Sequence, residues 1–461
     1  MSISYNALSG ALAAQAALNT VSQNIANAQT KGYTRQGVLL QASAGDGSSG
    51  MSPGNGVKIG SLLRFSDSYK SQQMWRAASD LGQHSQTQPY LTQMEKVMSD
   101  GKSSLSYGID TLFKAFNAAA VDPTSTPLRQ QVITAADSMS QQFNSIYNVT
   151  ANQLISVQQQ RSAILPGLNE SLAGIAALNQ QVISIGANGT NTSALIDQRE
   201  QLIDKVASQI GVEVLNNPDG TASISLKSGQ PLVVSNLYGK LTFDNSGSSP
   251  QLTLGFANTT FKLDDTKVGG QLGGLADYQE NTLKPLQKSI SEIAEQMTNK
   301  INTQLAAGFT SPGVPGTDLL KFNTANPTDG TIELLQVTSG FKTADLAFSS
   351  DGLPGDSGNL QQLVAIKGQP ITLTSLGSVL LGDADTQVVG KLGIDSQQNQ
   401  AQLNTATTVR QQSEDDWKST SAVNTDEEAI NLVEFQNMYQ ANMKVIAVAN
   451  TLFDATMKMF G

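Results

Sequence analysis

Residues 4–25, SYNALSGALAAQAALNTVSQNI, decide the architecture of this chain, because their apolar positions recur at alternating steps of three and four. A period of about 3.5 residues keeps one stripe of a helix against a partner helix over several turns. The stripe is formed by Ala7, Leu8, Ala11, Ala14, Leu18, Val21 and Ile25. The sequence therefore predicts an amphipathic helix that needs a partner.

A second stripe with the same spacing lies at the opposite end of the 461-residue chain. It is formed by Leu432, Phe435, Tyr439, Asn442, Ile446, Ala449 and Phe453. Just before it, Thr425 and Glu428 have the spacing of a capping box, and the acidic cluster around them suits a helix N-terminus. We predict that the two terminal helices pair as a coiled coil, in which Asn442 fixes the register.

Composition excludes several classes of function. The net charge is −10, and no cluster of Lys and Arg offers the positive surface that nucleic acid requires. The chain has no cysteine, so it forms no disulfide, thiolate nucleophile or zinc–sulfur site. Its longest apolar run, Val445–Ala449, is far shorter than the roughly 20 residues of a membrane-spanning helix, and no signal peptide is expected. We predict no nucleic-acid partner, no membrane insertion and no cofactor.

Helical periodicity dominates the first half of the chain after a turn at 27–32 and a loose, glycine- and serine-rich segment at 44–60. The helical pattern runs from about Asp67 to Ile210, where Pro166 is expected to kink or restart a helix. Turn-forming residues interrupt it at 101–108, 122–127 and 186–191. A helical bundle is the structure that this pattern favours.

The pattern changes to short strands after Gly211. The expected strands are 212–215, 222–226, 231–234, 240–243, 251–256 and 260–263. A helix is expected at 275–307 after the glycine-rich 269–274, then loops and strands at 309–394, then helices from Ser396 that break near 419–425.

This order predicts a mainly α chain with inserted β structure, in which inner domains are nested within outer ones. Residues 1–45 and 420–461 would form a terminal coiled-coil domain, which the family resemblance described below implies to be the axial core of an assembly. Residues 46–211, 269–308 and 395–419 would form a long helical bundle domain. Residues 212–268 and 309–394 would form an outer β-rich domain.

The most specific string is NIANAQTKGY at 24–33. Asparagine side chains near a helix end bond loose backbone carbonyls, and a glycine there adopts a positive φ. By this reading the string is simply a helix end. The residues concerned are Asn24, Asn27, Thr30, Gly32 and Tyr33.

Its surroundings add a resemblance. Leu8–Gln15, Leu18 and Ser22–Asn27 resemble the N-terminal signature of flagellar rod, hook and hook-associated proteins. Gly32–Gln36 and the segment LIDQREQL at 195–202 are similar to the hook-associated members of that family, and Gly54–Val57, Arg64, Asp67 and Tyr69 look like the segment that follows the signature. The closing segment, from Asn424 to Ile446, resembles the family's last helix.

The resemblance implies a structural subunit of the bacterial flagellum, not an enzyme, at the junction between hook and filament. Such a subunit is exported unfolded through the flagellar type III channel, so it would be extracellular after a transient stay in the cytoplasm. The implied partners are the hook protein, hook-associated protein 3, identical subunits in a helical or ring-like layer, and a cytosolic export chaperone that binds within residues 420–461. The terminal stripes would be the assembly surfaces.

Residues that could suggest catalysis are better explained by structural roles. His84 is the sole histidine and is expected on an exposed helix surface. The string GKS at 101–103 lacks the first glycine of a phosphate loop, and 269–274 is no dinucleotide fingerprint. The carboxylates at 264–265 and 414–416 are expected in solvated turns and helix ends. The alternatives are a hook or rod subunit of the same family, and a flagellum-associated enzyme with a catalytic insert in 212–268 or 309–394. A glycan-binding outer domain also stays open.

Overall fold

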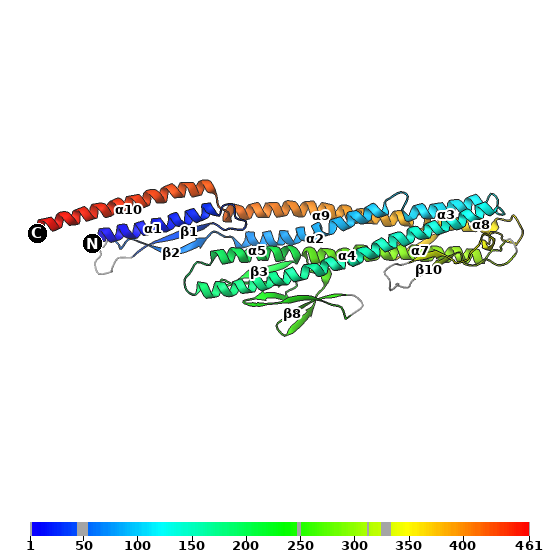
Figure 1. The fold of residues 1–461 in the computed structure, drawn as a ribbon, viewed down its shortest axis with the longest axis horizontal. Helices are drawn as coiled ribbons and strands as arrows, with labels where there is room; N and C mark the ends of the chain where they lie inside the picture. The colour runs from blue at the N-terminus through cyan, green and yellow to red at the C-terminus, as the bar shows by residue number, and fades with distance from the viewer. Residues whose placement is uncertain (1, 44–53, 247–249, 311–312, 324–332, 461) are drawn as a thin grey trace. The chain divides into compact units, whose positions relative to one another are not determined.

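A computed structural model describes residues 2–43, 54–246, 250–310, 313–323 and 333–460. It is mainly helical, with strands inserted between the helices, as the sequence predicted (Figure 1). The helices are α1 (Ser2–Ala26), α2 (Ser68–Met98), α3 (Leu105–Ala119), α4 (Thr126–Gly186), α5 (Ser193–Gln209), α6 (Gly270–Asp277), α7 (Lys284–Ala306), α8 (Gly358–Ala365), α9 (Ala384–Ser421) and α10 (Thr425–Phe460).

The strands form small antiparallel sheets. They are β1 (Gln36–Ala42), β2 (Val57–Arg64), β3 (Val212–Asn216), β4 (Ala222–Leu226), β5 (Pro231–Val234), β6 (Leu237–Tyr238), β7 (Lys240–Asp244), β8 (Gln251–Phe256), β9 (Thr259–Lys262), β10 (Leu320–Phe322), β11 (Leu335–Val337), β12 (Pro370–Leu373) and β13 (Gly377–Leu380). The sheet orders are β1-β2, β3-β4-β5-β6, β7-β8-β9, β10-β11 and β12-β13.

The chain divides into two compact units. Unit 1 comprises Met1–Asp80, Gly167–Leu263 and Thr407–Gly461, and unit 2 comprises Leu81–Pro166 and Asp264–Ala406. The two β regions that we grouped into one outer domain thus fall in different units. The three-domain division stays a prediction.

Unit 1 contains the terminal helices and seven of the inserted strands, β3–β9. The C-terminal part of α4 holds the sheets through two asparagine side chains. The Asn169 side chain donates to Leu241 O and accepts from Leu241 N, both at 2.8 Å. Fully buried Asn179 makes the same pair of bonds with Ala222, at 2.9 and 3.0 Å. Each amide occupies the place of a neighbouring strand.

Unit 2 is built around α3, α7 and the N-terminal part of α4. Along α7, buried apolar residues recur at three- and four-residue steps, as the core face of an amphipathic helix requires. They are Leu286, Ile290, Ile293, Ala294, Met297, Ile301 and Leu305. The strands β10–β13 are only three or four residues long. Residues 309–394, which we expected to form loops and strands, also contain α8 and the first residues of α9.

The predicted breaks at 101–108, 122–127 and 186–191 are confirmed by the ends of α2, α3 and α4. Pro166 neither ends nor restarts α4, and the side chains of Leu165 and Leu168 on either side of it are buried. Helix α9 begins at Ala384, twelve residues before the predicted Ser396. The β1–β2 hairpin was not predicted. Of the segment 44–60 that we expected to be loose, residues 44–53 lie outside the described ranges, and residues 57–60 instead belong to β2.

Candidate functional site: the terminal helix pair and its polar base

Helices α1 and α10 pack side by side within unit 1, which confirms that the two ends of the chain pair (Figure 1). Two contacts define their direction. A Cβ on Gly10 would lie 2.5 Å from Asn442 Oδ1, and Asn24 Nδ2 donates to Glu428 Oε2 at 3.1 Å. Asn24 follows Gly10 by fourteen residues, and Glu428 precedes Asn442 by fourteen. The helices are therefore antiparallel and stay in register between these two contacts.

Small residues form the buried side of α1, which packs against both α10 and the β1–β2 hairpin. Ala7, Ala11, Ala14 and Val21 of the predicted stripe are buried, as are Gly10, Ala13 and Ala17. Small side chains let two helix backbones approach closely. At Gly10 the approach leaves no room for a side chain beneath Asn442. The predicted seam residue Asn442 is thus half-buried over a glycine, and its amide donates to Met438 O of its own helix at 2.8 Å.

Large apolar residues of α1 face outward instead. Leu8 and Ile25 of the predicted stripe are exposed, Leu18 is half-buried, and Leu12 beside them is 55% exposed. In α10 the predicted residues Phe435, Tyr439, Ile446 and Ala449 are half-buried on the seam side, whereas Leu432 and Phe453 are exposed. The predicted stripes therefore mix residues of two faces, one that closes the pair and one that faces away from it.

The end of α10 extends past α1. In the register defined by Gly10–Asn442, the first residue of α1 lies opposite about residue 450, so roughly three turns of α10 have no α1 beside them. Residues 451–459 are all exposed. Leu452, Phe453, Met457 and Met459 form an apolar surface there, which we call the α10 extension.

A polar cluster forms the base of the pair. Asn24 is 1% exposed, yet all its hydrogen-bonding atoms are used. Its amide donates to Gln36 O at 2.8 Å and to Glu428, while its oxygen accepts from Tyr33 Oη at 2.9 Å and from Gln36 N at 3.1 Å. Burial, with the carboxylates of Asp197 and Glu428, raises the pKa of Tyr33 to about 12. Asn24 thus acts as the centre of the base.

Arg35 connects the base to the junction of α9 and α10. Its Nε donates to the buried Glu428 carboxylate at 2.7 Å and its Nη1 to Glu427 at 2.8 Å. Its backbone N donates to Ser421 O, at the end of α9, at 2.8 Å. Glu428 therefore does not complete the predicted capping box. Asn424 caps α10 instead, accepting from Asp426 N at 3.0 Å.

The signature turn lies against α5. Gly32 has φ +75°, as predicted, and a Cβ there would lie 2.7 Å from Gln201, whose amide donates to Lys31 O at 2.7 Å. Asn27 donates to Gln23 O and accepts from Thr30 Oγ1. These bonds are local and exposed. Of the five predicted residues, Asn24 makes a long-range hydrogen bond, to Glu428, and Gly32 lies against Gln201 of α5.

Arg64, at the end of β2, connects the β1–β2 hairpin to α5. Its guanidinium bonds Asp197 and Glu200 of α5, with Nη2 2.7 Å from each carboxylate, and Asp197 also accepts from Thr34 N at 3.1 Å. Burial alone would lower the pKa of Arg64, but Glu200 and Asp197 raise it overall. In the sequence, Arg64, Asp197 and Glu200 stand out only as parts of motifs. Their opposite charges were the available indication that Arg64 pairs with Asp197 and Glu200.

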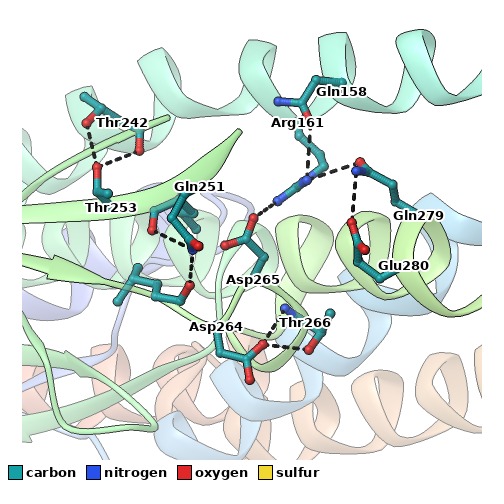
Figure 2. Close-up of polar contacts among 12 residues, drawn as sticks. Gln158, Arg161, Thr242, Gln251, Thr253, Asp264, Asp265, Thr266, Gln279 and Glu280 are labelled. Carbon is teal, nitrogen blue, oxygen red and sulfur yellow. Dashed lines mark hydrogen bonds and ion pairs between the residues drawn. The ribbon is translucent and has the colours of Figure 1, made fainter. Parts of the chain in front are cut away.

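Unit 2 contains a separate buried ion pair (Figure 2). The guanidinium of Arg161, 2% exposed, bonds Asp265 and also donates to Gln279 Oε1 at 3.2 Å and Gln158 Oε1 at 3.3 Å. Gln279 belongs to a π-helical turn, Tyr278–Leu283. The expectation of a solvated turn holds for Asp264, which accepts from Thr266 beside it, and is wrong for Asp265.

The other candidate catalytic groups lie in structural settings. His84 is half-buried rather than exposed, and its Nδ1 lies 2.9 Å from Asn399 Oδ1. Glu414 pairs with Lys418 along α9, and Asp415 and Asp416 accept from glutamines one turn earlier. In the described ranges, no group of three or more His, Asp or Glu side chains is placed to hold a metal ion. No described helix is long and apolar enough to cross a membrane.

Family models match three parts of the chain. The Flagellar hook-associated protein FlgK helical domain matches residues 91–320. The Flagellar basal body rod FlgEFG protein C-terminal model matches residues 419–459, and the Flagella basal body rod protein model matches residues 5–34. The last two matches cover the paired helices α10 and α1.

Complete proteins match as well. Flagellar hook-associated protein 1 of Bacillus subtilis is 26% identical over 97% of this chain and 96% of its own length, and that of Escherichia coli is 26% identical over 98% of each. The solved structure of the flagellar hook junction protein FlgK from Burkholderia pseudomallei is 25% identical with a TM-score of 0.51, covering 55% of this chain and 47% of that chain. The chain thus belongs to the flagellar hook-associated protein 1 family.

Proposed function

We propose that this protein is the structural subunit that joins hook to filament, and that its terminal helix pair packs among the helices of neighbouring subunits. One observation carries the proposal. The buried residues of α1 are small, except for Val21 and the polar Asn24, while large apolar side chains of both helices remain exposed on the outer faces. Soluble proteins rarely expose a contiguous apolar surface of this kind unless a partner covers it.

The energetic argument follows from the exposed side chains. Burying one large apolar side chain contributes about 1.5–3 kcal/mol. Tyr5, Leu8 and Leu12 of α1 and Val445, Val448 and Leu452 of α10 are all at least 43% exposed. Burial of this surface against several neighbours would offset the loss of freedom on assembly, even though each subunit alone gains nothing from it.

The α10 extension gives the contact a direction. A surface that meets a different surface on the next copy produces a ring or a helical layer. Since the extension lies beyond the end of α1, we propose that it reaches a subunit of the adjacent layer. The hook protein, hook-associated protein 3 and identical subunits are the proposed partners, and the proposed location is extracellular, at the distal end of the hook.

The test separates the outer face from the seam. Leu12→Asp changes an exposed residue of α1, so we expect a folded monomer that fails to enter the hook–filament junction. Gln15→Asp is the control, because Gln15 is also exposed on α1 but is polar. Swimming and immunogold labelling at the hook tip are measured in cells that lack their own copy. Normal swimming of the Leu12 variant would contradict the proposal.

Ile446→Asp tests the seam. Ile446 is half-buried on the α1 side of α10, so its replacement should both separate the helices and block incorporation, while unit 2 stays folded. For the unmodified protein, immunogold label along the whole hook or in the rod would favour the alternative that it is a hook or rod subunit. The relatives named above are all flagellar components, so we propose no catalytic role.

A further inference from the structure

A cavity of about 190 Å³ lies in unit 2 beside the first turn of α4. Its wall includes Pro123, Arg129, Thr343, Phe348 and Leu353. An apolar cavity of about 150 Å³ is large enough to hold benzene. This cavity therefore has room for a small organic group, and the assembly proposed above does not use it.

Arg129 is a buried cation without an acidic partner. The residue is 7% exposed, and its guanidinium donates to Thr343 O at 2.7 Å, to Pro123 O at 2.6 Å and to Leu346 O. A guanidinium has five N–H groups, so two of them have no acceptor among the described residues. No described carboxylate lies within ion-pair distance of Arg129, and burial lowers its pKa. A buried charge of this kind favours an anion as partner.

The guanidinium lies at the cavity wall. Thr343 and Pro123, whose carbonyls accept from Arg129, line the cavity. Phe348 lines it as well, and the centre of its ring lies 4.7 Å from Arg129 Cζ. Leu353 is 64% exposed at the same cavity. The cavity thus combines the Arg129 cation with the apolar side chains of Phe348 and Leu353, and hydroxyl groups such as those of Thr124 and Thr126 line the rest.

Asp356 also lines the cavity, but its charge is engaged elsewhere. Its carboxylate accepts from Ser349 Oγ at 3.2 Å, from Ser350 N at 2.5 Å and from Gly358 N at 3.0 Å. These bonds hold the pKa of Asp356 well below its usual range. The carboxylate therefore serves its own turn, although its charge weakens the attraction of the cavity for anions.

We propose that this cavity binds a carboxylate carried on a small apolar group. The carboxylate would accept from the two unused N–H groups of Arg129, and the apolar group would contact Phe348 and Leu353. A free organic acid and an acidic side chain of another protein share this chemistry. Hydrogen bonds to charged groups contribute enough to change affinity by about tenfold or more relative to a neutral isostere.

The experiment compares benzoate with benzamide, which has nearly the same shape but no charge. Binding to the full chain is measured by titration calorimetry, and the site is located by methyl NMR of Ala344, Thr124 and Leu353. We expect benzoate to bind at least about tenfold more tightly than benzamide and to shift these methyl signals. Equal affinity, no binding, or shifts confined to unit 1 would overturn the proposal. Tighter binding of inorganic phosphate than of benzoate would also overturn it, since phosphate has no apolar group.

Two variants complete the test. Arg129→Gln should abolish the preference for benzoate, and Leu353→Ala should weaken benzoate several-fold without touching the bonds that hold the loop. The second variant keeps the proposal testable if the first disturbs the local fold. The peptide acetyl-Glu-Leu-amide is measured beside benzoate. Whichever binds more tightly identifies the source of the carboxylate, and failure of both to compete for one site contradicts the assignment.

Discussion

Arg35 connects several elements at the base of the terminal helix pair. Its backbone bonds the end of α9, its guanidinium bonds the first turn of α10, and its Cζ lies 5.3 Å from the centre of the Phe65 ring. Glu428, its main partner, is 1% exposed. A buried carboxylate that loses its cation is far more costly than a surface carboxylate that does so.

Arg35→Ala should therefore lower the free energy of unfolding of unit 1 by about 3 kcal/mol and free α10 from α1. Trp75 and Trp417 are the chain's two tryptophans, and both are buried in unit 1, so their fluorescence during denaturation reports this unit. The matched control is Arg76→Ala, which breaks an exposed pair with Glu213 and should cost at most about 1 kcal/mol. Equal losses in the two variants would show that Glu428 needs no cation.

We expect Asp385 to make the stability of unit 2 depend on pH. One carboxylate oxygen accepts from Ser106 N at 2.8 Å, while the other is buried without a partner among the described residues. Burial raises the pKa of Asp385 to about 6, against about 3.9 in an unfolded chain. The folded state thus holds the proton more tightly. Its contribution of up to about 3 kcal/mol is complete below pH ~4 and is lost as the pH rises through about 6.

Asp385→Asn should remove this part of the pH dependence, because the amide does not ionise. Unfolding followed by circular dichroism at pH 4.5 and 7.5 should show a smaller difference in the variant than in the parent chain. Asp383→Asn, at an exposed position two residues earlier, serves as the control. A pH dependence identical in all three chains would contradict the assignment to Asp385.

Amide side chains on helices hold strands in place throughout the described chain. Asn144, Asn169, Asn179, Gln296 and Asn302 each bond both the N–H and the C=O of a strand residue. The strand residues are Leu335, Leu241, Ala222, Thr372 and Leu320. Such bonds satisfy backbone groups that no neighbouring strand reaches. They help to explain how such short strands persist beside long helices.

Asn169→Asp tests this role, since a carboxylate keeps the acceptor and removes the donor. It would place an oxygen against Leu241 O, where the amide now donates at 2.8 Å. We expect a loss of about 1–3 kcal/mol in the unfolding free energy of unit 1, measured by tryptophan fluorescence. Asn437→Asp, at an exposed position of α10, should change it by less than about 0.5 kcal/mol. Similar effects of the two variants would argue against the pairing.

The whole molecule brings its two ends together and leaves their outer faces uncovered. Before assembly, an exposed apolar surface of this kind is an aggregation hazard. The α10 extension is its most exposed part, with Met459 at 83% and Phe453 at 62% exposure. We therefore keep the prediction that the export chaperone binds within residues 420–461.

Deleting residues 420–461 should abolish chaperone binding in a calorimetric titration. Leu12→Asp leaves α10 intact and should retain it, which separates loss of the binding segment from a general effect on the terminal pair. Unchanged affinity of the truncated chain would refute the prediction. Loss of binding in the Leu12 variant would place part of the chaperone site on α1.

Element positions followed well from the sequence because their causes are local. Glycine, proline and asparagine in the sequence indicated the breaks before α3, α4 and α5. The six strands expected between residues 212 and 263, β3–β5 and β7–β9, begin and end within about one residue of their predicted bounds, whereas β1, β2 and β6 were not predicted. The ten residues of NIANAQTKGY indicated a helix end with a positive φ at Gly32, and the structure has both. The terminal stripes likewise predicted that the ends pair, since a 3.5-residue period leaves an apolar face that needs a partner.

Long-range partners did not follow, because nothing local specifies them. Glu428 lies next to Thr425 in a capping-box spacing, yet its carboxylate binds Arg35, 393 residues away, because burial makes a cation the better partner. The face that α1 buries also depends on the distance between the two helices. At Gly10 the helices approach so closely that a side chain would not fit. The alanines of α1 are accordingly buried, and Leu8 and Leu12 face outward. Sequence chemistry thus specified the helices and the need to pair them, and packing in three dimensions specified which side chains meet.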